Sequence, residues 1–397
     1  MAKGGKHDGK GRKFHIATEV VSAGRTPFAF EGFVNTPIFR GSTVLAPSAD
    51  QYLHKKGRYT YGRRGTPTTT ALEGALTTLE GGAGVVLTPS GLSAISTALL
   101  SVLQSGDHLL VTDSAYFPTR HFCDTVLKKF GVETSYYDPR ASAAIEKLLQ
   151  PNTRAVFLEA PGSLSFEMQD VPAIAEIAHA HGAAVLMDNT WATPVYFKPH
   201  EFGVDLSLAA GTKYLGGHAD VNLGWVSGTE KFFPALKEVH GTLGLCPGPE
   251  DVFLSLRGLR TLAVRLERHM ASALTVATWL KTRPEVLRVL HPALSDDPGH
   301  AIWKRDFAGA SGLFSFVLKP DHSAKAAAAF VDALELFGIG ASWGGFESLA
   351  IPFDCTKMRS ATKWAPGGPA IRLHIGLEDV DDLIADLERG FSALAQP

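Results

Sequence analysis

The sequence predicts an α/β protein with a large, mostly parallel sheet and a smaller C-terminal α+β domain. Two observations predict this fold class. From about residue 72 to residue 228, short apolar runs alternate with segments of helical periodicity, as in a βα repeat. After residue 228 the alternation stops, and a long helical pattern leads into a mixture of strands and helices. Strands that are apolar at every position indicate a sheet covered on both faces.

The apolar runs are the predicted strands of the large domain. They lie at Val85–Leu87, Leu109–Val111, Ala155–Leu158, Ala184–Met187 and Val204–Leu208. A helical pattern that includes Ile174 and Ile177 ends at Gly182, because glycine commonly stops a helix. Ligands of such sheets bind beyond the carboxyl ends of the strands, where Ser90 and Asp188 are expected.

The C-terminal part has its own pattern. A long helix is predicted after Arg260, followed by a strand at 313–317, a helix at 326–336, a strand at 371–375 and a closing helix from Val380 to Phe391. The first sixty residues have weak periodicity and indicate an extended arm. We therefore predict a tail and arm over 1–64, a large domain over 65–257 and a small domain over 258–397.

Composition places the chain among ordinary globular proteins. It has 397 residues, 45% of them hydrophobic and 20% charged, with a net charge of −2. This balance gives no electrostatic footprint for nucleic acid, and no apolar run reaches the roughly 18 residues that span a bilayer. The lysines and Arg12 of the first thirteen residues predict a disordered tail, with a functional basic arm as the alternative.

The cysteines indicate a reducing compartment. Cys123, Cys246 and Cys355 are far apart and form no CxxC pair, which argues against both a disulfide framework and a zinc site. The basic tail is not followed by an apolar stretch, so no secretory signal is expected. The predicted location is the cytoplasm.

Lys213 and Asp188 carry the most specific chemical signal. Lys213 follows Thr212 among small residues just after one apolar run, and Asp188 ends the preceding one. A lysine can hold the aldehyde of pyridoxal phosphate as a Schiff base, and a carboxylate can keep the pyridine nitrogen protonated. For each residue alone, the alternatives are a surface or salt-bridged lysine and an aspartate that caps a helix or a turn. The pair favours the cofactor.

Further residues follow predicted strand ends. Gly91 opens a helix after Ser90, which can leave backbone N–H groups free for a phosphate, although a plain tight turn has the same pattern. Tyr116 can stack on a flat ring or be an ordinary core aromatic. Arg372 lies inside a strand and suits a substrate carboxylate; a salt bridge to Glu378 or Asp379 is the alternative.

Several blocks, in order along the chain, resemble the cysteine/methionine-metabolism family of fold-type-I pyridoxal-phosphate enzymes, which have the aspartate-aminotransferase-like fold. The resemblance runs from about Thr18 to Ala395 and is most specific for the cystathionine β-lyase branch. The blocks are Tyr61 to Thr66, Leu79 to Gly84, Asp188 to Trp191, Thr212 to Leu215, Arg257 to Leu262, Ser342 to Ser348 and Ile371 to Gly376.

The resemblance implies a role for each matching residue. Lys213 would carry the cofactor, Asp188 would pair with its pyridine nitrogen, and Tyr116 would stack on its ring and assist proton transfer. The phosphate would be held by the following groups: the Gly91 and Leu92 amides, the Thr212 hydroxyl, and Tyr61 and Arg63 of a neighbouring subunit. Ser342, Trp343 and Arg372 would bind the substrate. The family is usually a homotetramer of two tight dimers with shared sites.

The implied activity is α,β-elimination from L-cystathionine, which yields homocysteine, pyruvate and ammonia. The alternatives are a cysteine desulfhydrase or broad carbon–sulfur lyase, a γ-acting relative, and a non-catalytic protein of the same fold. Ala210 stands where many relatives have serine, and the Ala160-Pro161-Gly162-Ser163 segment replaces a common Ser-Asn-Pro. A phosphate contact and a contact to the ring hydroxyl are therefore in doubt. Trp343 replaces a residue that is commonly smaller in γ-acting relatives.

Overall fold

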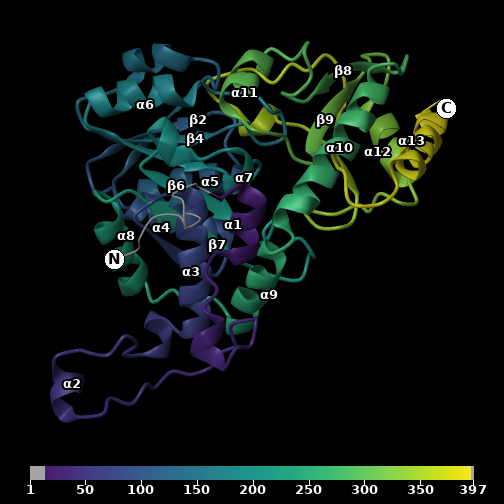
Figure 1. The fold of residues 1–397 in the computed structure, drawn as a ribbon. Helices are drawn as coiled ribbons and strands as arrows, with labels where there is room; N and C mark the ends of the chain where they lie inside the picture. The colour runs from purple at the N-terminus through teal and green to yellow at the C-terminus, as the bar shows by residue number, and fades with distance from the viewer. Residues whose placement is uncertain (1–13, 395–397) are drawn as a thin grey trace.

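The computed structural model describes residues 14–394 and contains two sheets, each covered by helices (Figure 1). The basic N-terminal segment of the sequence lies outside the described residues. Within the described part, no helix combines the length and hydropathy needed to span a bilayer.

The larger sheet has seven strands in the order β1-β7-β6-β5-β4-β2-β3. Their bounds are β1 Gly84–Thr88, β2 His108–Thr112, β3 Glu133–Tyr137, β4 Thr153–Glu159, β5 Ala184–Asp188, β6 Leu206–Ala210 and β7 Gly224–Gly228. Every neighbouring pair from β6 to β3 is parallel, and β7 alone runs antiparallel to both of its neighbours. The predicted mostly parallel sheet is confirmed.

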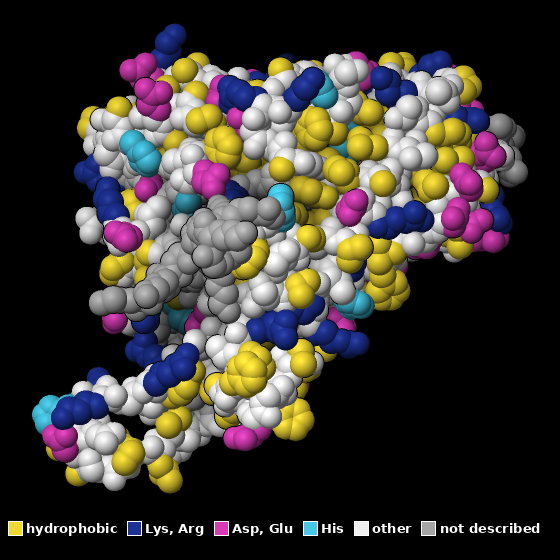
Figure 2. Space-filling view, viewed as in Figure 1, with side chains coloured by type: hydrophobic (Ala, Val, Ile, Leu, Met, Phe, Trp, Pro, Cys, Tyr) yellow, Lys and Arg dark blue, Asp and Glu magenta, His cyan; other side chains and the backbone are white. Residues whose placement is uncertain are grey.

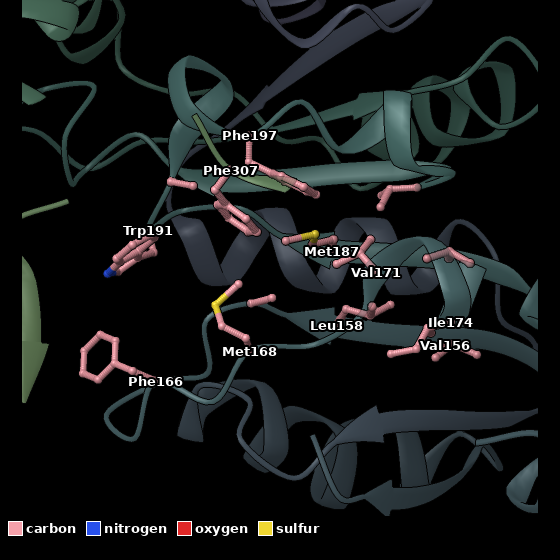
Figure 3. Close-up of a cluster of buried hydrophobic side chains, with 14 of the residues drawn as sticks. Val156, Leu158, Phe166, Met168, Val171, Ile174, Met187, Trp191, Phe197 and Phe307 are labelled. Atoms are coloured by element: carbon pink, nitrogen blue, oxygen red, sulfur yellow. The ribbon is translucent and has the colours of Figure 1, made fainter. Parts of the chain in front are cut away.

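Helices cover both faces of this sheet because its strands are apolar on both faces. On β4, Val156 and Leu158 face one core and Ala155 and Phe157 face another, and all four are fully buried. Figure 3 shows the first of these cores, in which the strand residues pack with α6 and with Phe307 of the C-terminal part. Complete burial of a Val, Leu or Phe side chain contributes roughly 1.5–3 kcal/mol to the free energy of unfolding. The α-helices before the second sheet are α1 Ile16–Ser22, α2 Ala49–Leu53, α3 Pro67–Glu80, α4 Gly91–Leu100, α5 Phe117–Phe122, α6 Val171–Ala180, α7 Thr193–Tyr196, α8 Phe233–Thr242 and α9 Pro249–Leu259. Short 3₁₀ helices lie at Pro27–Phe30, Gly62–Arg64, Ser142–Leu148 and Pro199–Phe202, and a π-helical segment follows α5 at Cys123–Leu127.

The smaller sheet has four antiparallel strands in the order β10-β11-β9-β8. The elements are α10 Leu262–Leu280, β8 Val286–Leu290, α11 His300–Asp306, β9 Leu313–Leu318, α12 Ala324–Asp332, β10 Leu349–Phe353, β11 Ala370–His374 and α13 Val380–Leu394, with a turn at Thr356–Met358. α10 runs from the large domain to this sheet (Figure 1). Phe330 of α12 and Phe391 of α13 pack on Phe316 of β9 and so close one face.

Among the element bounds that differ from the sequence prediction, two have a clear physical cause. The strand predicted over 204–208 begins at Leu206, because the Asp205 carboxylate accepts a hydrogen bond from the Val185 amide instead of continuing as a strand side chain. The helix predicted over 326–336 is α12, which begins earlier, behind its Ser323 cap, and ends at Asp332. The carboxylate of Asp386 accepts from the backbone amides of residues 335–337, which holds that segment outside the helix.

The N-terminal arm projects away from both sheets. Residues 33–65 leave the body as an extended excursion that carries α2 at its far end (Figure 1). Leu45, Tyr52 and Leu53 are between 72% and 89% exposed, and the arm shows apolar and basic side chains together (Figure 2). None of the apolar side chains in residues 33–65 belongs to the buried core.

A buried carboxylate ties the two domains together. Asp113, just after β2, accepts hydrogen bonds from the backbone amides of Ser360, Ala361 and Thr362 at 2.8–3.2 Å. These residues belong to the segment 354–369 that joins β10 to β11. Asp113 also pairs with Arg120 at 2.8 Å, and its side chain is fully buried. Burial alone would raise the pKa of this carboxyl, but the hydrogen bonds from Ser360, Thr362 and Ala361 lower it below its ordinary value.

Replacement of Asp113 by asparagine is expected to destabilise the protein by about 3 kcal/mol at pH 7, because Arg120 loses its buried partner and the amide group carries no charge. Because the pKa of Asp113 is lower in the folded protein than its ordinary value of 3.8, ionised Asp113 stabilises the fold at pH values above 3.8. This stabilisation is lost as pH falls through the folded-state pKa. The difference between wild type and Asp113→Asn should therefore shrink below about pH 4. Urea unfolding at pH 7 and at pH 3 measures it. A difference that is independent of pH would contradict this role.

Candidate active site

A cavity of about 470 Å³ lies at the carboxyl ends of the parallel strands, where the two sheets meet. The residues predicted from the sequence that line it are Gly91, Leu92, Tyr116, Asp188, Thr212, Lys213, Ser342, Trp343 and Arg372. They come from six separate stretches of the chain. Loops after β1, β2, β5 and β6 supply one wall, and β11 with the 341–343 segment supplies the other.

Lys213 follows β6 and extends into the cavity. Its Nζ donates to Ser342 Oγ at 2.5 Å and lies 5.3 Å from the centre of the Trp343 ring. Burial lowers the pKa of the amine to about 8, and the charge of Arg372 acts in the same direction, while Asp188 opposes it. A substantial share of the amine is therefore neutral near physiological pH, as a base or nucleophile requires.

Asp188 and Glu159 end the neighbouring strands β5 and β4 and stand directly opposite each other in the register. Both line the cavity. Asp188 Oδ1 accepts from the Thr190 amide at 2.9 Å and from the Thr190 hydroxyl, so this carboxylate also closes a turn at the end of β5. Burial raises the pKa of Asp188 in spite of these bonds and of the Lys213 charge. A cationic group in the cavity would favour its ionised form.

Arg372 reaches the cavity from β11. Its Nη2 donates to the Ser342 carbonyl oxygen at 2.9 Å. The alternative of a salt bridge to Glu378 or Asp379 is wrong. The Glu378 carboxylate accepts from the amide and hydroxyl of Ser348, and the Asp379 carboxylate accepts from the Asp381 amide. Burial lowers the pKa of Arg372 to about 10, which leaves the guanidinium charged and available for an anion.

The first turn of α4 provides a phosphate-sized set of donors. The Ser90 side chain accepts from the Ser93 amide, and the Gly91 and Leu92 amides before it are first-turn donors that no earlier carbonyl of the helix can accept. A Cβ at Gly91 would lie 2.6 Å from Ala210 Cβ, so only glycine fits this approach of α4 to β6. The Thr212 hydroxyl is bonded to the backbone of Leu223 and would have to rotate to donate to a phosphate.

Tyr116 stands at the cavity mouth with 45% of its surface exposed. Its backbone amide donates to Glu159 at 2.7 Å. Burial, Glu159 and Asp188 together raise the pKa of the phenol, so the hydroxyl is protonated and can donate a hydrogen bond or a proton.

Tyr61 and Arg63 do not reach this cavity. They lie at the base of the arm, where Arg63 Nη1 donates to the Gly241 carbonyl oxygen of the same chain at 2.9 Å. The ring of Tyr61 is 45% exposed. The resemblance implies that they contact the cofactor phosphate of a neighbouring subunit, and this stays a prediction.

Glu159 and Ala341 are among the cavity residues that the sequence analysis did not single out. Glu159 has the same signal as Asp188, a carboxylate at the end of an apolar run, and could have been found by it. Ala341 belongs to an irregular segment and gave no signal. Ser163, whose role was in doubt, lines the cavity, and its amide donates to the Ser114 carbonyl oxygen at 2.8 Å. Cys355 is buried away from the cavity lining.

The donor set fits pyridoxal phosphate better than a metal. In residues 14–394 no cluster of three or more His, Cys, Asp or Glu side chains could hold a metal ion. The cavity instead offers an amine, a buried carboxylate and free helix-terminal amides. These are the partners that an aldehyde, a pyridine nitrogen and a phosphate require.

Comparisons with known proteins agree with this donor set. A family model described as Cys/Met metabolism PLP-dependent enzyme matches residues 17–392. The cystathionine β-lyase MetC of Escherichia coli K12 is 45% identical over 389 residues, which cover 96% of this chain and 98% of that protein. A Rhizobium johnstonii protein that carries the name cystathionine β-lyase provisionally is 55% identical over 381 residues, 95% of this chain and 96% of its own length.

A solved structure extends the comparison to the fold. The crystal structure of cystathionine γ-lyase from Lactobacillus plantarum, complexed with L-serine, has a TM-score of 0.88 and 32% identity, and the match covers 96% of this chain and 99% of that one. This chain belongs to the Cys/Met-metabolism family of pyridoxal-phosphate-dependent enzymes. Its fold is that of the fold-type-I enzymes, and its cofactor is pyridoxal 5′-phosphate.

Loss of the Arg372 charge is expected to raise the pKa of Lys213 above its value of about 8. In cofactor-free protein, uptake of pyridoxal phosphate needs the neutral amine, so the uptake rate should increase as pH rises through about 8 in the wild type. In Arg372→Met the midpoint should move to higher pH. Arg288→Met, at an exposed position of β8, serves as the control. An unchanged midpoint in Arg372→Met would mean that Arg372 does not act on the amine.

Proposed function

We propose that this enzyme is a carbon–sulfur β-lyase that converts L-cystathionine and water to homocysteine, pyruvate and ammonia. The observation that carries the proposal is the meeting of Lys213, Asp188 and Arg372 in one cavity between the two sheets. The relatives from Escherichia coli and Rhizobium johnstonii, which match over nearly their whole lengths, support the choice of substrate.

In this proposal the cavity residues first fix the two ligands. The Arg372 guanidinium binds the α-carboxylate of the amino acid through two parallel N–H donors, with Ser342 beside it. Asp188 would pair with the protonated pyridine nitrogen of the cofactor, and the Gly91 and Leu92 amides would hold its phosphate. Tyr116 would stack on the ring at the cavity mouth. The Thr212 hydroxyl could add a phosphate contact after rotation away from Leu223.

Lys213 and Tyr116 then manage the protons. Bound pyridoxal phosphate draws electron density from the substrate α-carbon and so makes its proton acidic. The Lys213 amine, with its pKa of about 8, removes that proton while the β-carbon–sulfur bond breaks. The protonated Tyr116 hydroxyl gives a proton to the departing thiolate, which leaves as homocysteine. Water converts the remaining three-carbon unit to pyruvate and ammonia. Trp343 covers the amine and limits its contact with water.

The product set tests the substrate and the reaction. Purified, cofactor-loaded enzyme supplied with L-cystathionine is expected to yield pyruvate and homocysteine in equal amounts. A yield of 2-oxobutyrate and cysteine would assign γ-elimination instead. Absence of turnover with L-cystathionine but release of pyruvate and sulfide from L-cysteine would assign a desulfhydrase.

Substitution of Lys213 by alanine should lower kcat by about 10³-fold, the share that a positioned general base supplies. It should also remove the visible absorbance of the bound cofactor, because no amine is left to hold it. Lys304→Ala, at an exposed site on α11, is the control and should keep both properties. Visible absorbance and turnover retained in Lys213→Ala would sink the assignment.

The exposed arm supports a shared-site oligomer. We propose a homotetramer of two tight dimers in which Tyr61 and Arg63 of each arm bind the cofactor phosphate of the neighbouring subunit. Within the described part of the chain, nothing buries the apolar side chains that are exposed on the arm. Such a surface is expected where a second copy of the chain covers it. We further propose that residues 1–64 serve this arm, while 65–257 and 258–397 form the two halves of the cavity. A cytoplasmic location fits the three unpaired cysteines.

Complementation between two inactive variants tests the shared site. Lys213→Ala and Arg63→Ala should each be weakly active alone. When they are co-expressed at equal levels, hybrid dimers have one intact site, so about a quarter of the sites should regain wild-type activity. A mixture no more active than its parents would show that Arg63 serves its own chain.

A further inference from the structure

The segment 342–345 of the small domain lies directly on the backbone that carries Lys213. Ser342 has a φ of 80° and Gly344 a φ of 88°. A Cβ at Gly344 would lie 2.9 Å from the carbonyl carbon of Lys213 and 2.9 Å from the Tyr214 nitrogen, so no side chain fits there. The position of this segment therefore sets how Ser342 and Trp343 meet the Lys213 amine.

His374 forms a hydrogen bond with the backbone of this segment. Arg372 and His374 are two residues apart on β11 and share the face toward the cavity, while Ile371 and Leu373 face the core of the small domain. The His374 ring is fully buried, and its Nε2 lies 3.1 Å from both the Gly344 amide nitrogen and the Gly345 carbonyl oxygen. Either neutral tautomer thus makes one hydrogen bond to the segment. A protonated ring could not accept from Gly344.

The surroundings keep this ring neutral. His374 packs against the rings of His269 and Tyr214, with centroid separations of 5.3 and 5.8 Å. Burial lowers the pKa of His374 to about 3, and His269, Arg372 and Lys213 contribute in the same direction. The hydrogen bond to the segment is consequently unaffected by pH across the physiological range.

We infer that His374 is a positioning residue for substrate binding: through its bond to the 344–345 backbone it holds Ser342 against Arg372 and Lys213. The Ser342 carbonyl oxygen accepts from Arg372 Nη2 at 2.9 Å, and the Ser342 hydroxyl accepts from Lys213 Nζ at 2.5 Å. One short segment thereby orients both the carboxylate-binding guanidinium and the amine. This inference rests on the proposed binding of the α-carboxylate by Arg372.

Three substitutions of His374 distinguish the effect of its hydrogen bond to the 344–345 backbone from the effect of its side-chain volume. His374→Gln can place an amide group near the position of Nε2, His374→Asn is too short to do so, and His374→Leu fills the site without a polar group. The readout is the dissociation constant of L-alanine, an amino acid without a β-leaving group, followed through the visible absorbance of the cofactor-loaded enzyme. The loss of one hydrogen bond should weaken L-alanine binding about tenfold in the Asn and Leu variants, and His374→Gln should stay within about twofold of wild type.

A purely structural role would give another result. It would lower the melting temperature of the variants without changing the dissociation constant, and that outcome overturns the inference. Equal affinities of the Gln and Asn variants overturn it as well, as does failure of the Gln variant to fold. If only the Leu variant fails to fold, the comparison of Gln with Asn decides. Because L-alanine binding needs no carbon–sulfur cleavage, the result stands apart from the fate of the proposed lyase activity.

Discussion

Burial of the Lys213 amine is the interaction on which the site depends. An ammonium group in a cavity of this depth loses hydration, and the nearby guanidinium of Arg372 adds repulsion, so the amine gives up its proton more readily. Asp188 opposes this from the neighbouring strand and prevents a larger shift. The balance needs groups from both sheets, because Asp188 ends β5 and Lys213 follows β6, whereas Arg372 lies on β11.

The interface between the domains is therefore part of the chemistry. The segment 354–369 is attached to the large domain at two points. Asp113 accepts hydrogen bonds from its backbone amides, and Arg359 forms an ion pair with Glu167 at 3.0 Å. Both attachment points adjoin loops that line the cavity, those after β2 and β4. A loose domain contact would let Arg372 drift relative to Lys213. The Arg359–Glu167 ion pair and the hydrogen bonds to Asp113 oppose that drift by fixing one geometry, and the hydrogen bonds offset the desolvation cost of the buried charges.

The parallel sheet and many of the cavity residues could be predicted, because both leave local patterns in the amino-acid sequence. Apolar runs mark β1, β2, β4, β5 and β6, and a charged residue at a run's end marks Asp188. β7 was not among the predicted strands, since Gly224 and Gly228 bound it and little of it is apolar. The contact of Asp113 with Ser360 joins positions 247 residues apart and leaves no local trace. His374 reads as one more strand residue until the fold places it beneath Gly344.

The projecting arm links the folding of one chain to the presence of another. Its apolar side chains are not covered within the described part of the chain, so hydration of that surface opposes the arm's ordered shape in an isolated subunit. A second copy that covers it would add its binding free energy to that of folding, by an amount that grows with the logarithm of subunit concentration. Thermal resistance of this protein would then be a property of the solution as well as of the chain, and dilution alone would erode it.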